Sequence, residues 1–260
     1  MAHPETTQRS MRPPDQLPQL VVMNITTGME FCRMRGHTDA IMWAEWSVDE
    51  ETIATASWDR TYRIWNALTG NCKHVIGPTN GQNWCGGFFG DGKHVLLTGA
   101  TPTKVSTYDI GTAQQRHVFV PPEGIKLDWM RCLAVHPVRD LVILQNGRAL
   151  LAWNPCLSGS QASNVQVIFT LKPAENFFVN RRGGVQTLKW VDGGTKLLAQ
   201  GEEHTIYVWD IERHVKWRFQ RPKGRAIEDG SGIDVLYYFR RKEAEWVVSV
   251  GENRARLWRL

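Results

Sequence analysis

The chain has 260 residues, of which 42% are hydrophobic and 22% charged, and its formal net charge is +5 at pH 7. A chain of this length and composition can bury a large core in one domain, which excludes a fully disordered protein. We expect no signal peptide and no membrane span, and the five cysteines contain no C-x-x-C pair. These features argue against a disulfide-rich secreted scaffold and favour a reducing compartment, the cytoplasm or the nucleus.

Residues 1–17 are polar and proline-rich and contain no apolar run. Such a composition cannot bury enough apolar surface to offset the entropy of ordering, so we expect a disordered lead. The folded domain should occupy residues 18–260.

The segment from Gly36 to Asn66 predicts three short strands with turns between them. The first contains Ile41, Trp43 and Trp46, and the second, residues 53–57, is rich in small and β-branched side chains. A tight turn at residues 59–60 leads into the third strand, and a further turn at residues 69–70 leads into a fourth.

This segment resembles a WD repeat, the unit of a β-propeller blade. In that family a His, a Ser or Thr, an Asp and a Trp form a hydrogen-bonded chain inside the blade. The matching residues are His37, Ser57, Asp59 and Trp65. The resemblance implies that Asp59 holds the imidazole, which reaches Ser57, which in turn meets the indole N–H.

The same Ser, His and Asp could suggest a hydrolase, and we reject that interpretation. A nucleophilic serine must be exposed beside an oxyanion hole, and no G-x-S-x-G elbow occurs in the chain. The eight histidines show no metal-ligand spacing. We therefore predict no catalytic residues, no metal and no cofactor.

The unit recurs in weaker form along the chain, so we predict an all-β propeller with about five recognisable blades. Trp65 is followed by Tyr108, Trp153, Trp209 and Trp258 at corresponding positions. The approximate units are residues 36–76, 77–120, 121–172, 180–220 and 230–260.

Ring closure has two alternatives. Residues 29–34 could supply the missing fourth strand of the last unit and close a five-bladed ring. However, LVVMNITTG (residues 20–28) aligns with YRIWNALTG (residues 62–70), which makes it similar to the third strand of a preceding blade. In that case the chain is a fragment of a larger ring, for which seven blades are commonest in the family.

The positive charge is concentrated near the C-terminus. Residues 213–260 carry a net charge of +6, and the rest of the chain carries −1. One interpretation of this pattern is a surface that binds an acidic partner, either nucleic acid or anionic lipid. The other is a surface that is only exposed to solvent. No aromatic–basic RNA motif accompanies the charge, which favours the solvated surface.

The resemblance implies a non-enzymatic scaffold or adaptor that binds other proteins within a multiprotein complex. A propeller that docks on nucleic acid or anionic lipid is the alternative, and a propeller enzyme is the least favoured class. Partners of this family usually meet the top of the ring. The positions that correspond to that surface are Met42, Trp58, Trp84, Thr101, Trp129, Arg131, Gln186 and Glu202.

Overall fold

The computed structural model describes residues 13, 16–100, 103–121, 123–127, 130, 132–146, 149–155, 164–170, 187–200, 205–219, 235–242, 244–251 and 254–260. Within these ranges the regular structure consists of antiparallel strands and one short 3-10 turn. No described helix is long and apolar enough to cross a membrane. The disordered lead predicted for residues 1–17 lies almost wholly outside the described residues.

The strands form six sheets in chain order. The N-terminal sheet contains β1 (Gln19–Met23) and β2 (Glu30–Arg35). The first sheet contains β3 (Ile41–Trp46), β4 (Thr52–Ser57), β5 (Tyr62–Asn66) and β6 (Cys72–Ile76). The second sheet contains β7 (Gly86–Phe88), β8 (His94–Ala100), β9 (Thr103–Asp109) and β10 (Gln115–Val118).

The remaining three sheets continue in the same order. The third contains β11 (Leu133–Val135), β12 (Val142–Asn146), β13 (Ala149–Asn154) and β14 (Asn164–Thr170). The fourth contains β15 (Thr187–Val191), β16 (Lys196–Gln200), β17 (Ile206–Asp210) and β18 (Val215–Phe219), with the 3-10 turn η2 (Asp192–Gly194). The fifth contains β19 (Val235–Arg241), β20 (Ala244–Gly251) and β21 (Arg254–Arg259).

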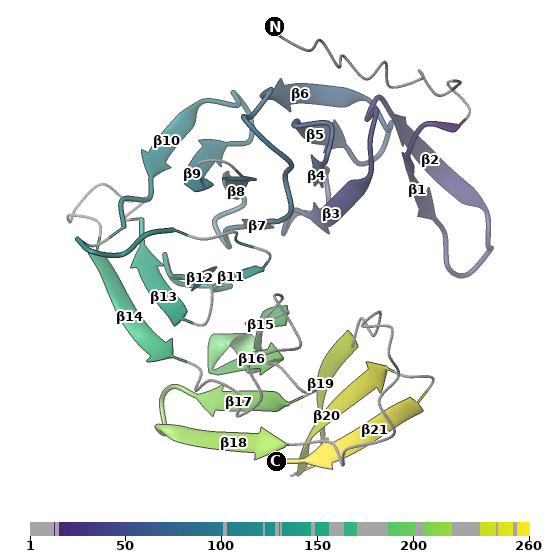
Figure 1. Ribbon diagram of the computed structural model, residues 1–260. Helices are drawn as coiled ribbons and strands as arrows, with labels where there is room; N and C mark the ends of the chain where they lie inside the picture. The colour runs from purple at the N-terminus through teal and green to yellow at the C-terminus, as the bar shows by residue number, and fades with distance from the viewer. Residues whose placement is uncertain are drawn as a thin grey trace, which may run out of the picture.

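The sheets follow one another around an arc, with the first strand of each four-stranded sheet nearest the centre (Figure 1). The inner strands β3 and β7, β7 and β11, and β11 and β15 contact one another in succession. The fourth strands lie at the outer rim (Figure 1). This radial arrangement of antiparallel sheets is the architecture of a β-propeller and confirms the predicted fold.

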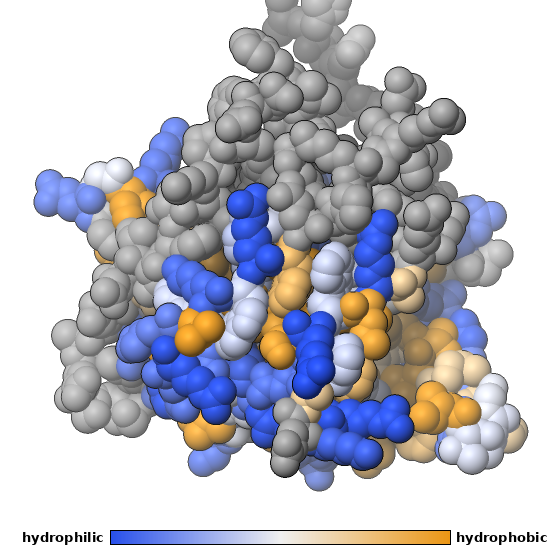
Figure 2. Space-filling view, turned by 90° about the horizontal axis from the view of Figure 1, so that it is seen from below, coloured by the Kyte–Doolittle hydropathy of each residue, from blue (hydrophilic) through white to orange (hydrophobic). Residues whose placement is uncertain are grey.

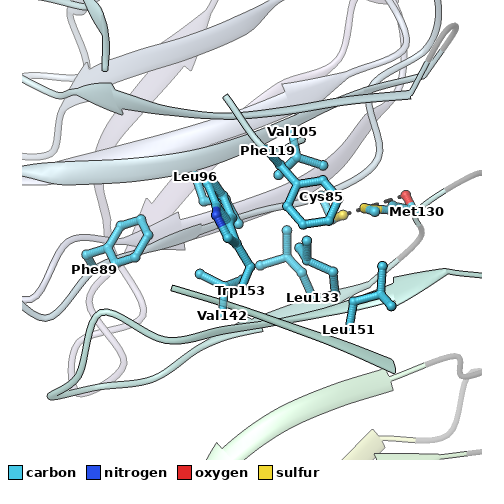
Figure 3. Close-up of a cluster of buried hydrophobic side chains, with 11 residues drawn as sticks. Cys85, Phe89, Leu96, Val105, Phe119, Met130, Leu133, Val142, Leu151 and Trp153 are labelled. Atoms are coloured by element: carbon cyan, nitrogen blue, oxygen red, sulfur yellow. Dashed lines mark hydrogen bonds between the residues drawn. The ribbon is translucent and has the colours of Figure 1, made fainter. Parts of the chain in front are cut away.

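The hydrophobic core lies between neighbouring sheets. Figure 3 shows one such cluster, in which Phe89 and Leu96 of the second sheet meet Val142 and Trp153 of the third. Trp153 is fully buried, and its ring meets that of Phe119 edge to face at 5.3 Å between centroids. Comparable clusters lie between the other neighbouring sheets. Each sheet is therefore stabilised by burial against its neighbours, as expected for a repeat architecture.

The same turn joins the third and fourth strands in successive sheets. Asn66 Oδ1 accepts the N–H groups of Leu68 and Thr69 at 3.0 and 2.9 Å, and Gly70 N–H donates to Asn66 O at 2.9 Å. Asp109 makes the equivalent bonds to Gly111 and Thr112 in the second sheet. This turn explains why Asn or Asp follows the aromatic residue that ends these third strands.

The N-terminal sheet repeats that turn. Asn24 Oδ1 accepts the N–H groups of Thr26 and Thr27 at 2.9 and 3.0 Å, and Gly28, at φ 68°, donates to Asn24 O at 2.8 Å. Strands β1 and β2 are thus the third and fourth strands of a further blade. The pairing of β1 with β2 and the Asn24 turn agree with the alignment of residues 20–28 with residues 62–70.

The alternative closure prediction is wrong. Strand β2 contains most of the proposed closing segment, residues 29–34, but it pairs with β1 in the register Val21 to Arg33. Strand β21 is the edge of a three-stranded sheet and pairs, within the described residues, only with β20. The Asn24 turn folds β2 back onto β1, because local pairing closes a shorter loop than pairing with a distant strand.

Candidate functional site

Several hydrogen bonds hold the turn between β4 and β5. Thr61 N–H donates to Asp59 Oδ1 at 2.8 Å, and Ser57 N–H donates to Thr61 O at 3.2 Å. Arg60 lies in the left-handed region with φ 72°. A non-glycine residue at positive φ is costly, so the surrounding hydrogen bonds must hold it. The turn is therefore a rigid platform at one end of the sheet.

A chain of polar side chains connects this platform to the sheet interior. His37 Nδ1 lies 2.7 Å from Asp59 Oδ2, and His37 Nε2 lies 2.7 Å from Thr55 Oγ1. Trp65 Nε1–H donates to Thr55 Oγ1 at 2.9 Å. Because a carboxylate only accepts, His37 carries a proton on Nδ1. His37, Thr55 and Trp65 are almost completely buried, and each has a partner.

The hydroxyl in this chain belongs to Thr55 and not to Ser57, as the resemblance had implied. Trp65 pairs with Ile53 in the sheet register, so Thr55 is the next residue on the same face of β4. Ser57 is a further two residues along the strand, about 13 Å from Ile53 at 3.3 Å per residue. Ser57 instead accepts the Asp59 N–H at 3.1 Å and donates to Asp39 O at 2.9 Å.

The electrostatics of Asp59 agree with a structural role. Burial alone would raise the pKa of its carboxyl, but the hydrogen bonds from His37 and Thr61 outweigh burial and hold the pKa well below its usual range. Asp59 is therefore an acceptor fixed in the ionised form. Ser57 is fully buried and its hydroxyl is engaged in the turn, so it is not placed as an exposed nucleophile.

Two tryptophans meet beside this turn. The rings of Trp58 and Trp84 lie edge to face with 5.3 Å between centroids. Both side chains are half-buried, so each keeps an accessible part. Trp58 Nε1 is buried and has no hydrogen-bond partner among the residues that the structure describes. Edge-to-face pairing adds stability beyond burial and fixes both rings in position.

The linker between the first and second sheets holds this tryptophan pair. Asn83 N–H donates to Ser57 O at 3.3 Å, and Thr79 N–H donates to Arg60 O at 2.8 Å. Thr79 Oγ1 also donates to Asn83 Oδ1 at 2.8 Å. Asn83 is fully buried, and its Nδ2 has no hydrogen-bond partner within the described part of the chain. The linker and the turn thus form one connected surface across two sheets.

Met42 lies in a β-bulge close to the turn. The register between β3 and β4 shifts between Ile41 and Trp43, which leaves Met42 as the extra residue. A bulge redirects the side chain of its extra residue, and Met42 is 38% exposed. Two residues before it, Ala40 O accepts the Trp58 N–H at 2.9 Å. Met42, Trp58 and Trp84 are called the tryptophan surface below.

The other expected binding residues cannot be placed. They lie outside the residues that the structure describes, and they are Thr101, Trp129, Arg131, Gln186 and Glu202. Sequence reasoning also missed Thr55 and Asn83. The strand pairing of β4 with β5 identifies Thr55, and no signal in the sequence indicated Asn83.

The later sheets keep only parts of the polar chain. In the third sheet Leu144 takes the position of Thr55, and the buried Trp153 Nε1 has no partner. In the fifth sheet Trp258 Nε1–H donates to Ser249 Oγ at 3.1 Å. The third sheet therefore depends on packing around Trp153 where the first sheet has a hydrogen bond.

An ion-pair network that the sequence did not reveal joins the fourth and fifth sheets. Lys196 Nζ lies 2.7 Å from Asp192 Oδ2, 3.6 Å from Asp210 Oδ2 and 3.2 Å from Glu245 Oε2. Arg240 Nη2 lies 2.8 Å from Asp192 and 2.9 Å from Glu245. Burial alone would lower the pKa of Lys196, but its bonds to Asp192 and Glu245 raise it. These charges hold the last two sheets together.

The described residues contain no group of three or more His, Cys, Asp or Glu side chains arranged to hold a metal ion. The arrangement found at the tryptophan surface is a rigid, partly apolar platform with a few polar atoms. Such a surface is suited to binding another molecule.

Comparison with known proteins identifies the segment that contains Met42 and Trp58. Residues 29–66 match the family model described as WD domain, G-beta repeat. The chain carries a WD repeat, and its sheets are arranged as the blades of a β-propeller. No curated protein shows a significant match to the sequence. WD repeats generally mediate protein–protein interaction as scaffolds and are typically non-enzymatic.

Proposed function

We propose that this chain is a non-enzymatic scaffold that binds partner proteins through the tryptophan surface. The observation that carries the proposal is the edge-to-face pair of Trp58 and Trp84 at 5.3 Å, which bridges two blades and stays half-exposed. Tryptophans held in this way are typical anchors of protein interfaces. The buried Asp59–His37–Thr55–Trp65 chain supports the turn beneath them, so little entropy is lost on binding.

The chemistry of the surface also indicates the kind of contact that a partner makes. Met42 and the two indole rings offer apolar area, and methionine adapts to differently shaped partners. Arg60 is exposed in the same turn and can bind a carboxylate at the rim. A partner with an apolar anchor and an acidic rim would fit this surface.

Free cysteines at positions 32, 72, 85 and 132 support the cytoplasm or the nucleus as the compartment in which this protein acts.

The test is a pull-down with the double substitution Trp58→Ala and Trp84→Ala, followed by mass spectrometry. The matched control is Leu68→Ala, because Leu68 is 62% exposed at the other end of β5. We expect the double variant to lose its main partners and Leu68→Ala to keep them. If the double variant keeps every partner while it remains folded, the tryptophan surface is not the binding site.

A second candidate is binding to nucleic acid or anionic lipid through the C-terminal blades. Figure 2 views the side of β18 and β21, where the described side chains are mainly hydrophilic, with single apolar residues between them. Exposed basic residues on these outer strands include Lys216, Arg218 and Arg259. Electrostatic binding of this kind should weaken steeply between 50 and 200 mM salt, by a factor of about 10³ for six phosphate contacts. Binding that does not change with salt would exclude this candidate.

A further inference from the structure

Thr38 is the only serine or threonine in the 260 residues that has an arginine three positions before it. Arg35 stands at that position, and Arg33 precedes Thr38 by five residues. Protein kinases select substrates partly by such charge patterns, because acidic groups of the kinase bind basic side chains at fixed positions relative to the reacting hydroxyl. The segment RMRGHT (residues 33–38) therefore has the pattern that an arginine-directed serine/threonine kinase binds.

The two arginines lie on one exposed face of β2. They are two residues apart in a strand, so their side chains point the same way, whereas Met34 between them is buried. Gln19 Oε1 accepts Arg33 Nη1–H at 2.8 Å and Arg35 Nε–H at 3.3 Å. This shared acceptor holds the two guanidinium groups beside each other.

Both arginines border a cavity of about 450 Å³ that is lined also by Glu30 and residues 70–72. Arg33 forms an ion pair with Glu30, and both side chains are exposed. An exposed ion pair contributes little to stability, so it is easily exchanged. An acidic group of another protein that enters this cavity can therefore take the place of Glu30 and bind both arginines.

Thr38 lies in an irregular segment, between the end of β2 at Arg35 and the start of β3 at Ile41. Its side chain is exposed, whereas that of the preceding residue, His37, is buried. Within the described part of the chain, no hydrogen bond engages the Thr38 hydroxyl. The hydroxyl is therefore accessible to a second protein on the folded chain.

Thr38 is also bonded to the turn that presents the tryptophan surface. Its N–H donates to Asp59 Oδ2 at 3.1 Å, and the same oxygen lies 2.7 Å from His37 Nδ1. Asp59 directly follows Trp58, and Ala40 O, two residues after Thr38, accepts the Trp58 N–H at 2.9 Å. A change of charge at Thr38 therefore acts on the support of Trp58.

We propose that Thr38 is phosphorylated by an arginine-directed serine/threonine kinase, and that the phosphate releases partners from the tryptophan surface. The Thr38 Oγ1 attacks the γ-phosphorus of ATP, the bond from that phosphorus to the oxygen shared with the β-phosphate breaks, and ADP leaves. The hydroxyl proton passes to the catalytic base of the kinase. The release of partners rests on the function proposed above, whereas the modification itself does not.

The phosphate adds a charge of about −1.5 to −2 beside a carboxylate. Asp59 is ionised and accepts the N–H of the residue that would carry the phosphate, so the two negative groups repel each other. Repulsion of this size across about 5 Å of water changes an equilibrium on the order of tenfold. It weakens the bonds from Asp59 to Thr38 and Thr61, which hold the turn, and Trp58 is then less firmly positioned.

The first experiment tests the modification. The full chain is incubated with ATP and a purified kinase that selects peptides with arginine at these two positions, and the modified residues are mapped by mass spectrometry. We expect phosphate on Thr38 and none on Thr69, an exposed threonine with Asn66 three residues before it. Arg35→Ala should slow the reaction by about tenfold or more, whereas Arg139→Ala, at an exposed arginine of the third blade, should not.

A synthetic peptide of residues 31–41 shows that the kinase is active on this segment. The proposal is wrong if the kinase modifies the peptide but leaves Thr38 of the folded full chain unmodified. It is also wrong if Arg35→Ala is modified as fast as the wild type, because the charge pattern then does not select Thr38.

The second experiment tests the consequence on the phosphorylated full chain, with Thr38→Val treated in the same way as the control. We expect amide exchange in residues 57–61 to become about tenfold faster, while exchange in β8 and β9 stays unchanged. Partners captured in the pull-down should bind the phosphorylated chain about tenfold more weakly. Thr38→Val keeps the N–H that binds Asp59, so it should bind them equally before and after treatment.

Unchanged exchange in residues 57–61, or partner binding that complete phosphorylation leaves intact, overturns the proposal. These failures are distinguishable from failure of the proposed function. The modification and the amide exchange are measured without a partner, whereas the double variant Trp58→Ala and Trp84→Ala tests the tryptophan surface without any phosphate.

Discussion

The indole of Trp65 donates to the hydroxyl of Thr55 at 2.9 Å, deep inside the first blade. The same hydroxyl lies 2.7 Å from His37 Nε2, so one side chain satisfies two buried polar groups. Thr55 thereby links the third strand of the blade to the segment that precedes its first strand. The link ties the blade interior to the turn that presents Trp58.

Thr55→Val should destabilise the protein strongly, although the side chains of valine and threonine have nearly the same shape. It leaves both the Trp65 N–H and His37 Nε2 without a partner, and each buried unsatisfied group costs about 1–3 kcal/mol. We expect the free energy of unfolding in urea to fall by about 2–4 kcal/mol. Thr38→Val, at an exposed position, should change it little. Equal effects of the two substitutions would contradict the role assigned to Thr55.

Asp59→Asn should make the stability of the protein less dependent on acid pH. The pKa of Asp59 is lowered in the folded state, so its ionised form adds stability above the unfolded value of about 4. This contribution is lost as pH falls from about 4 through the folded pKa. We expect the free energy of unfolding in urea to be higher for the wild type than for the variant by an amount that is constant from pH 5 to 7 and decreases below pH 4. A difference that increases as the pH falls would contradict the role assigned to Asp59.

Lys196→Met should loosen the last blade. Lys196 is 3% exposed and neutralises carboxylates from both blades, and removing one partner of a buried ion pair costs about 3 kcal/mol or more. We expect faster amide exchange in β19–β21 than in β3–β6. The control is Lys93→Met, because Lys93 is exposed in the corresponding turn of the second blade. Uniform exchange across the blades would show that the network does not hold the last blade.

The cysteines should differ in reactivity towards a thiol reagent. Burial raises the pKa of Cys85 to about 12 and raises that of Cys132 well above its usual value. Because the thiolate is the reactive form, both should resist alkylation at pH 8 until the protein unfolds. Cys72 is exposed and should react first. Mass spectrometry of the alkylated peptides gives the order, and early modification of Cys85 would contradict the packing between the second and third blades.

The sequence predicted the architecture because the blade pattern is local. Strand alternation, the Asn66 turn and the aromatic residues at the ends of third strands all lie within one unit, so they can be recognised without any distant contact. The alignment of Leu20–Gly28 with Tyr62–Gly70 was informative for the same reason. It indicated a third strand in this segment, and the structure adds the Asn24 turn with its hydrogen bonds.

The features that sequence could not predict depend on register or on contacts between blades. The resemblance implied Ser57 for the polar chain, but Thr55 carries a hydroxyl on the same face of the strand, and the pairing of Ile53 with Trp65 distinguishes the two. The network around Lys196 joins residues almost fifty positions apart, so no short motif contains it. The pairing of Trp58 with Trp84 likewise depends on how the linker between two blades folds.

The most direct test of the proposed function is a footprint of the bound partner by hydrogen–deuterium exchange. The partner captured in the pull-down is added to the full chain, and amide exchange is compared with that of the free protein. We predict slower exchange in residues 40–42, 57–60 and 79–84, which carry and support the tryptophan surface. Protection confined to β18 and β21, with no change in these three segments, would contradict the account.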